Sequence, residues 1–446
     1  MRSVAILKQP WREPAAVLSA FAHEPWVCAF LSGGQGPRAR WSYVMRGPDR
    51  VLQAGDKPFA ALAELIGAGL PSHPDGPPFQ GGVAGLAAYE LGDHVEHLGL
   101  TRHPDWPDLS AARYPALLAF DHEHGEVLAL GRGDDEAQAN HRATAAAAWM
   151  EAPERQAGRG ALSDSFEPTT PAAHYEAAVA EVVGRIEAGE IFQANIARRW
   201  SGRLVDGAAP FDVLARLVGS SPAPFAAYLS MPGRAVVSNS PERFVSIGAG
   251  DELTVETRPI KGTRPRGRDA REDAALIAEL AASAKDRAEN LMIVDLMRND
   301  LSRVCPAGAV AAPDLFRVET FPNVHHLVST VTGRLAPGMG AVELLQAAFP
   351  PGSITGAPKV QAMKVIAAAE PPRGPYCGSM FWAGADGAFD SSVLIRTVAL
   401  VEDAAGWRFE APAGAGIVAD SDPVAEREET EAKILSLRRA LTEPLA

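Results

Sequence analysis

Two stretches of the sequence place carboxylates on one face of a helix. In KDRAENLMIVDLMRND, Asp286 and Glu289 are three residues apart and therefore share a helix face. In SDPVAEREETEAKIL, Glu426 and Glu429 repeat that spacing, and Lys433 follows on the same face. Carboxylates from two such helices would form an oxygen site for Mg²⁺, which completes its shell with water and ligand oxygens. The alternative is two solvated faces, with Glu429 and Lys433 forming an ordinary i,i+4 ion pair.

A basic turn offers a second kind of chemistry. Four arginines surround Lys261 in VETRPIKGTRPRGR, a glycine- and proline-rich run at residues 255–268. Like charges nearby lower the pKa of a lysine and make a neutral, nucleophilic amine more accessible. The backbone N–H groups of Gly262 and Thr263 could also hold a carboxylate. The alternatives are a solvated basic loop or a nucleic-acid patch. The second is weakened because the chain is acidic, with 42 Lys+Arg against 55 Asp+Glu and a net charge of −13, whereas nucleic-acid binding needs an excess of cations.

Two glycine-containing segments could approach a ligand closely. The run PPGSITGAPKVQAMKVI predicts a helix that begins at about residues 356–357, where free N–H groups and Lys359 would suit an anion. The alternative is a plain junction between a loop and a helix. In APAGAGIVADSD, Gly414 and Gly416 allow close backbone approach. This run lacks the strand, spacing and helix of a dinucleotide fingerprint.

The histidines and cysteines are weaker candidates. The HEH sequence at residues 122–124 could hold a metal, but a plain hairpin turn is the favoured interpretation. Of His325 and His326, one is expected to be a polar group facing its own strand rather than a ligand. The three cysteines are too few and too scattered for a disulfide framework or a zinc site. Their scarcity fits a reducing compartment.

Composition and length limit the class of protein. The chain has 446 residues, 47% of them hydrophobic and 22% charged, as in ordinary globular proteins of two or three domains, or of one large domain. The polar stretch 151–170 predicts a linker between an N-terminal region, 1–150, and a catalytic region, 171–446. The N-terminus has no leader-like apolar segment, and no apolar run approaches the length that spans a bilayer. We therefore expect a soluble, cytoplasmic protein that binds neither membrane nor nucleic acid.

The elements that must position these residues form clusters of strands separated by isolated helices. A hairpin is predicted at residues 116–120 and 127–130, and Asp422 or Ser421 is expected to cap the last helix. Further strands are predicted at 225–229, 235–238, 244–247, 253–257, 379–383 and 392–401. Helices are predicted at 172–188, 271–283, 285–299, 342–348 and 423–441. This order favours an α+β sheet sandwich over a doubly wound fold.

Taken together, these segments resemble the chorismate-utilising enzymes, and within them the aminodeoxychorismate synthase component I branch. The strongest matching blocks run through residues 189–433 in the family order. The blocks are PFQGGVAGLAAYELG (78–92), GEIFQANIARRW (189–200), SNSPERF (238–244), ETRPIKGTRPRG (256–267), KDRAENLMIVDLMRNDL (285–301), VHHLVS (324–329), GSITGAPK (352–359), YCGSMFW (376–382), SSVLIRT (391–397) and AGAGIVADSDPVAEREETEAK (413–433).

The resemblance implies a fold and a site. The fold would be two antiparallel sheets packed face to face with helices outside, and the site would lie between them. Glu289 and Glu429 would ligate Mg²⁺ that binds the ring carboxylate of chorismate, with Asp286 and Glu426 nearby. Glu242 would be the general acid that protonates the departing C4 hydroxyl. The residues implied to hold the substrate are Gly262, Thr263, His326, Ser353, Tyr376, Arg396, Gly414, Gly416 and Lys433.

Two positions distinguish members of the family. Relatives that form isochorismate or salicylate carry a lysine where this chain has Gln193, and a glutamine cannot act as a general base. Anthranilate synthases usually have alanine at the position of Lys261. The resemblance therefore implies that Lys261 attacks C2 of chorismate and expels the C4 hydroxyl. Ammonia then adds at C4 to give 4-amino-4-deoxychorismate, a precursor of p-aminobenzoate and folate.

The resemblance also implies partners. Ammonia would come from a separate class I glutaminase subunit, because none of the cysteines lies in a glycine-flanked nucleophile turn. We also expect no fused pyruvate lyase after the last block. Residues 31–44 resemble the region that holds tryptophan in some members. The alternatives are anthranilate synthase component I, which Lys261 argues against, and a catalytically silent binding subunit, which the retained Lys261, Glu242 and Glu289 argue against, as does Glu429.

Overall fold

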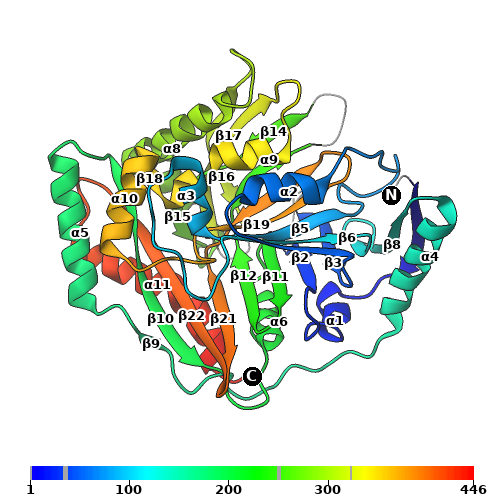
Figure 1. Cartoon of the computed structure of the whole chain (residues 1–446). Coiled ribbons are helices and arrows are strands. Elements are labelled where there is room, and N and C mark those ends of the chain that lie inside the picture. Colours follow the sequence, from blue (N-terminus) through cyan, green and yellow to red (C-terminus); the bar gives the residue numbers. More distant parts are fainter. Residues whose placement is uncertain (1–2, 34–38, 249–252, 322–323, 446) are drawn as a thin grey trace.

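Two large antiparallel sheets pack face to face, with helices on their outer faces (Figure 1). The computed structural model describes residues 3–33, 39–248, 253–321 and 324–445. Between the sheets, Tyr43 and Leu229 of the first sheet join Met380 and Trp382 of the second in one buried cluster. The predicted α+β sandwich is therefore confirmed.

The first sheet contains β1 and β22, the first and the last strand along the chain. Strands β10 and β22 lie near one of its edges. Its strands, in spatial order, are β1 (Ser3–Pro10), β8 (Glu126–Gly133), β7 (Ala116–Asp121), β3 (Trp41–Met45), β2 (Cys28–Leu31), β11 (Phe225–Met231), β12 (Arg234–Ser240), β21 (Thr397–Asp403), β22 (Gly406–Ile417), β10 (Gln193–Arg203) and β18 (Gly356–Ala357), with β9 (Glu167–Pro168) paired to β10.

The second sheet begins at β15, the edge strand that holds Lys261. Its strands, in spatial order, are β15 (Ile260–Pro265), β17 (Val324–Arg334), β14 (Thr254–Thr257), β13 (Arg243–Ile247), β20 (Phe389–Val393), β19 (Ser379–Gly384), β5 (Gly82–Ala87), β6 (Leu109–Tyr114) and β4 (Arg50–Ala54), with β16 (Ala311–Thr320) paired to β17.

The helices cover the two outer faces of the sandwich. Apolar residues of α1, α6 and α11 pack on the first sheet, and those of α2, α8 and α9 pack on the second. Within the described ranges, no helix combines the length and apolar character needed to cross a bilayer. The helices are α1 (Pro14–Ser19), α2 (Pro58–Ile66), η2 (Tyr89–Gly92), α3 (Asp93–Glu96), α4 (Glu136–Ala147), η3 (Ala148–Glu151), α5 (Ala172–Glu187), α6 (Pro210–Ser220), α7 (Ala270–Ala282), α8 (Ala284–Ser302), α9 (Ala341–Ala348), η4 (Gly352–Ile354), α10 (Lys359–Ala369) and α11 (Pro423–Thr442).

Strands from both sides of residues 151–170 share both sheets. In the first sheet β2 pairs with β11, and in the second β5 pairs with β19. The intervening segment packs on the sandwich, because Leu162 and Phe166 are buried and the N–H of Leu162 donates to the carbonyl of Leu441. Both regions therefore contribute to one shared core.

Local signals predicted several elements correctly. The hairpin forms as β7 and β8, and the helices predicted in the catalytic region appear as α5, α7, α8, α9 and α11. At the start of α11, the Asp422 side chain accepts from the N–H of Ala425, so Asp422 is the cap. Ser421 instead donates to Glu426 at 2.7 Å.

Two predicted elements are wrong in detail. The single strand predicted at residues 392–401 is two strands, β20 in the second sheet and β21 in the first. The chain crosses between the sheets through Arg396, whose φ of +51° breaks the extended conformation. The helix expected from residues 356–357 begins at Lys359, because Gly356 and Ala357 pair with β10 as β18.

The predicted anion-binding role of Lys359 is contradicted by its contacts. The Lys359 ammonium donates to the Asp300 carboxylate at 2.7 Å and to the carbonyl of Ala348 at 2.5 Å. Both charged side chains are buried. The lysine ties α10 to α8 and α9 and is not free for an anion.

Removing one member of this buried pair should destabilise the fold. Lys359→Met leaves the Asp300 carboxylate without its cation, and we expect a loss of about 3 kcal/mol in the free energy of unfolding. The double variant Lys359→Met/Asp300→Leu should recover most of that loss. Denaturant unfolding followed by circular dichroism measures both. Equal stability of the single variant and the unmodified chain would contradict the structural role.

Candidate functional site

The amine of Lys261 reaches from the second sheet to the first. It lies 3.9 Å from Oε2 of Glu289 and 3.5 Å from Oε1 of Gln193. A β-carbon added to Gly416 of β22 would lie 2.9 Å from the lysine Nζ. Burial lowers the pKa of Lys261, an effect that Glu289 opposes and Lys433 reinforces. The structure therefore holds a desolvated amine directly over a glycine.

The face of β10 and β22 that meets Lys261 is lined by amides and glycines. Gln193 and Asn195 lie two residues apart on β10 and therefore point to the same side. A β-carbon at Gly414 would lie 2.7 Å from Oδ1 of Asn195 and 3.0 Å from the Tyr376 hydroxyl. A side chain at either glycine would clash with these neighbours, so the two glycines let the polar side chains approach the sheet closely.

Two acidic residues reach the same region from the outer helices. Burial raises the pKa of Glu289 on α8, with Lys261 opposing the shift and Glu429 on α11 reinforcing it. The Glu429 carboxylate pairs with Lys433 at 2.6 Å, and Lys433 also donates to the carbonyl of Gly414 at 2.9 Å. Although burial opposes the shift, Lys433 lowers the pKa of Glu429. The i,i+4 ion pair therefore forms, and it forms at the site.

The other two acidic candidates are held by different partners. Asp286 pairs with Arg264 at 3.1 Å and packs on Gly262, whose φ of +88° turns the chain after Lys261. Glu426 accepts from the Ser421 hydroxyl, and burial raises its pKa. The charge of Asp286 nevertheless acts on Glu289, and that of Glu429 acts on Glu426, so both carboxylates border the region.

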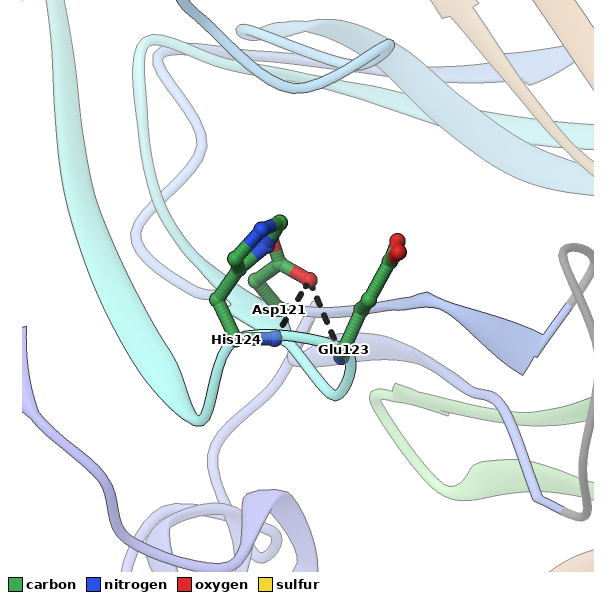
Figure 2. A group of neighbouring side chains, drawn as sticks. All are labelled: Asp121, Glu123 and His124. Atoms are coloured by element: carbon green, nitrogen blue, oxygen red, sulfur yellow. Dashed lines mark hydrogen bonds and ion pairs between the residues drawn. The ribbon is translucent and has the colours of Figure 1, made fainter.

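Among the described residues, a group of three potential metal ligands lies away from Lys261. Asp121, Glu123 and His124 place ligand atoms within 4.8 Å of one another in the β7–β8 turn (Figure 2). Arg40 already binds both Asp121 oxygens, at 3.0 and 2.7 Å, and lies 3.3 Å from Glu123. The hydrogen bond with Arg40 lowers the pKa of Asp121 to about 2, although burial opposes the shift. A guanidinium occupies the place of a cation, as the interpretation of a plain hairpin turn requires.

A buried carboxyl group faces the lysine from the short connection between β12 and β13. Glu242 forms a hydrogen bond with Ser353 of η4, and the charge of Lys261 acts on it. Burial nevertheless dominates and raises the pKa of Glu242 to about 7. The group is therefore able to hold a proton near neutral pH and give it up to a ligand.

Thr263, His326 and Arg396 form a further group. Thr263 Oγ1 lies 2.8 Å from Nδ1 of His326, whose pKa burial lowers to about 4, with Arg396 lowering it further. This imidazole is neutral near pH 7. In the described part of the chain, no hydrogen bond or ion pair engages the Arg396 guanidinium, which suits an anion. The neighbouring His325 instead contacts Thr320 and Asp273, as expected for one of the two histidines.

Sequence reasoning missed Arg373, which binds backbone and side-chain groups of several site elements. Its guanidinium donates to the carbonyls of Asn195 at 2.7 Å and Ile354 at 3.1 Å, and it pairs with Glu370 at 2.8 Å. It also lies 5.8 Å from the ring centroid of Tyr376. The signal available was an arginine directly after a pair of prolines, which carries no information about burial.

A cavity lies between the sheets, and Lys261 is not among its lining residues. Its volume is about 530 Å³, and its lining includes Leu31, Ser32, Trp41 and Tyr43 from the region of the predicted tryptophan site. Residues 34–38 of that region lie outside the described residues. The Trp41 and Tyr43 rings stack at 6.5 Å, so this cavity has an aromatic wall.

Comparison with known families identifies the family to which the chain belongs. Residues 28–439 match the model of the chorismate binding enzymes. The chain belongs to this family. It is a chorismate-utilising enzyme.

Individual relatives come from two branches. The chain is 36% identical to aminodeoxychorismate synthase component 1 of Escherichia coli, over 98% of this chain and 99% of that protein. It is 40% identical to anthranilate synthase component 1 of Streptomyces coelicolor, over 92% of this chain and 82% of that protein. The structure of anthranilate synthase component I from Streptococcus pneumoniae superposes with a TM-score of 0.78 at 27% identity, covering 91% of this chain and 93% of that chain.

A side chain at Gly416 should strongly reduce turnover without unfolding the chain. In Gly416→Ala the new methyl meets the end of the flexible Lys261 side chain and the Gln193 amide, both of which can move aside. We expect chorismate turnover to fall by about 100-fold or more, because displacement of a reacting group by about 1 Å has that effect. Chorismate consumption and the thermal unfolding midpoint should be measured together. A variant as active as the unmodified chain would contradict this role of Gly416.

Proposed function

We propose that this chain is the chorismate-converting component of an aminodeoxychorismate synthase. The observation that carries the proposal is the Lys261 amine, whose pKa burial lowers and which lies over Gly416 beside Glu289. A neutral amine in this position is a nucleophile. Aminodeoxychorismate synthase component 1 proteins match at 36–37% identity over nearly the whole chain, which supports the same conclusion.

The lysine explains the position of the new C–N bond. Attack of Lys261 Nζ on C2 forms a C–N bond, shifts the conjugated double bonds and breaks the bond from C4 to its hydroxyl. Ammonia then attacks C4, the double bonds shift back, and the lysine leaves C2 as a free amine. The sum is chorismate plus ammonia giving aminodeoxychorismate plus water. A single displacement by ammonia would instead leave nitrogen at C2.

Glu242 would supply the proton that this sequence needs. Hydroxide is a poor leaving group, and protonation by a positioned acid converts it to water. Because the pKa of Glu242 is about 7, a large fraction of the group is protonated near neutral pH. The proton that Lys261 loses on forming its bond to C2 replaces the proton that Glu242 donates.

Mg²⁺ fits the donor set at this site. The carboxylates of Glu289 and Glu429 face one region from two helices; burial raises the pKa of Glu289, and repulsion from Glu429 adds a smaller contribution. That repulsion is what a bound dication relieves. Glu289 and Glu429 would hold the ion, with Asp286 and Glu426 nearby. The bound metal would supply positive charge for the ring carboxylate of chorismate, whereas Arg396, Tyr376 and Lys433 would orient the rest of the substrate.

Ammonia would come from a separate glutaminase component. The name component 1 carried by the relatives refers to one part of a two-part enzyme. The aromatic cavity formed in part by Trp41 and Tyr43 would be the place for tryptophan. The glutaminase component and tryptophan are the partners that the proposal assigns to this chain.

Anthranilate synthase component I is the second candidate. The specific observation in its favour is the 40% identity to the Streptomyces coelicolor protein, above that to the aminodeoxychorismate synthases cited. Lys261 argues against anthranilate synthase, since amination at C2 needs no covalent lysine. The product therefore decides between the two.

Product analysis with and without Lys261 tests the proposal. The purified chain, incubated with chorismate, Mg²⁺ and ammonium, should form aminodeoxychorismate, identified by chromatography and mass spectrometry. Without ammonium, intact mass should reveal a chorismate adduct, because the second displacement cannot follow. Lys261→Ala should lose both the adduct and the product, since no other amine occupies that position.

Lys364 offers a matched control, because it lies on α10 outside the residues placed at the site. Lys364→Ala should retain adduct and product. Anthranilate as the product would refute the proposal in favour of the second candidate. An adduct that survives in Lys261→Ala would refute the nucleophile while leaving the product assignment open to its own measurement.

The pH dependence should report Glu242. As a general acid it acts when protonated, so kcat should fall as pH rises through about 7, the value to which burial raises its pKa. Glu242→Gln cannot donate a proton, and we expect a loss of about 100-fold or more together with disappearance of this limb. Steady-state rates from pH 5.5 to 9 measure it. A limb at the same pH in Glu242→Gln would assign the titration to another group.

A further inference from the structure

Lys261 lies in a β-bulge. The register between β15 and β17 shifts between Ile260 and Thr263, so two residues of β15, Lys261 and Gly262, face one residue of β17, Leu327. Gly262 has a φ of +88°, a conformation that glycine adopts without strain. A bulge bends its strand and redirects the side chains within it. It therefore sets the direction in which the Lys261 side chain leaves β15.

The side chain of Asn290 binds both strands beside this bulge. Its Nδ2 atom donates to two carbonyls at 3.4 Å each, that of Pro259 directly before β15 and that of Leu327 opposite the bulge. Its Oδ1 atom accepts from the hydroxyl of Ser329 on β17. Asn290 is fully buried, so this amide provides two N–H donors and one acceptor to the strands alone. Neither the family resemblance nor the proposed mechanism gives it a role.

Ser329 fixes the orientation of the Asn290 amide. The Ser329 hydroxyl accepts from the N–H of Phe316 at 3.0 Å, which leaves its own proton for Oδ1 of Asn290. The two carbonyls on the other side of the amide can only accept, so they require Nδ2. A bulge interrupts the ladder of hydrogen bonds between strands, and a buried carbonyl without a donor is costly. The asparagine therefore supplies donors where the strands are irregular.

The same helix carries the carboxylate beside Lys261. Asn290 follows Glu289 on α8, and the Lys261 amine lies 3.9 Å from the Glu289 carboxylate. Four residues before Asn290, Asp286 packs on Gly262, where an added β-carbon would lie 2.8 Å from the Asp286 carboxyl carbon. Residues four apart share one face of a helix, so one face of α8 holds the bulge at two points.

We propose that Asn290 is a positioning residue that aims Lys261 at C2 of chorismate by holding the bulge of β15. The inference rests on the proposed function, because it concerns the attack by Lys261. Displacement of a reacting group by about 1 Å slows a reaction about 100-fold, so the bulge controls the rate of attack. Binding of the substrate depends on the bulge less, because Thr263 remains joined to His326 beyond it at 2.8 Å.

Single-turnover formation of the chorismate adduct tests this role. The full chain is mixed with Mg²⁺ and varied chorismate without ammonium, and intact mass follows the adduct with time. In Asn290→Ala the limiting rate should fall about 100-fold, whereas the half-saturating chorismate concentration should change by less than about threefold. A limiting rate equal to that of the unmodified chain, or a loss confined to affinity, would overturn the proposal.

Ser329→Ala and Ser163→Ala form a matched pair, and they keep the test decisive if Asn290→Ala fails to fold. Both serines are buried, but the Ser163 hydroxyl donates to carbonyls of Ser165 and of Arg203, at the opposite end of β10 from Gln193. Ser329→Ala should slow adduct formation about tenfold, the effect of losing one hydrogen bond, and Ser163→Ala should leave the rate unchanged. Added to Asn290→Ala, Ser329→Ala should slow it less than about twofold further, because the serine acts through the asparagine. Losses that multiply would overturn the proposal.

Hydrogen exchange tests the contact without substrate. In Asn290→Ala the backbone amides of residues 260–263 should exchange at least about tenfold faster, whereas those of β12 should keep their rates. Unchanged exchange at the bulge would overturn the proposal. Failure of the proposed function would show in the unmodified chain, as anthranilate or as the absence of an adduct. Failure of this inference shows only in the variants, so the two are distinguishable.

Discussion

The contact between Lys261 and Gly416 is the constraint on which the rest of the site depends. Lys261 lies on β15, the edge strand of one sheet, and Gly416 lies on β22 of the other. The amine can reach β22 because position 416 has no side chain. The antiparallel pairing of β10 with β22 then places Asn195 opposite Gly416 and Ala197 opposite Gly414. A shift of one residue in that pairing would turn the side-chain amides of Gln193 and Asn195 to the opposite face.

Electrostatics follow from this packing. The chain has a net charge of −13, yet Lys261 and Lys433 lie close enough for the charge of Lys433 to act on Lys261. Glu289 and Glu429 oppose them from the outer helices. The acidic surplus is therefore compatible with an anionic substrate, because net charge describes the whole surface and the local field is set by groups within a few ångströms. Buried ion pairs such as Lys359–Asp300 remove further charges from that field.

Features that depend on a few neighbouring residues could be predicted from the sequence. The helix that Asp422 caps and the β7–β8 hairpin arise from local patterns and formed as expected. The crossing at Arg396 could not be predicted, because the sequence 392–401 is uniformly compatible with a strand and only the two sheets separate its halves. Lys359 presented the same difficulty, since its partner Asp300 is distant in sequence. The roles of Arg373 and Asn290 also depend on burial, which no local pattern revealed.

The geometry over Gly416 also bears on the choice of reaction. Lys261 Nζ and the Gln193 side chain share one small space, with Nζ 3.5 Å from Oε1. A second lysine at position 193 would place two ammonium groups there, and each would lower the pKa of the other and oppose binding of a shared cation. An amide at 193 avoids this repulsion and accepts from the amine. A lysine that activates water at position 193 and a lysine that attacks carbon at position 261 are therefore alternative uses of one space. This chain fills that space with Lys261, the nucleophile of the proposed reaction.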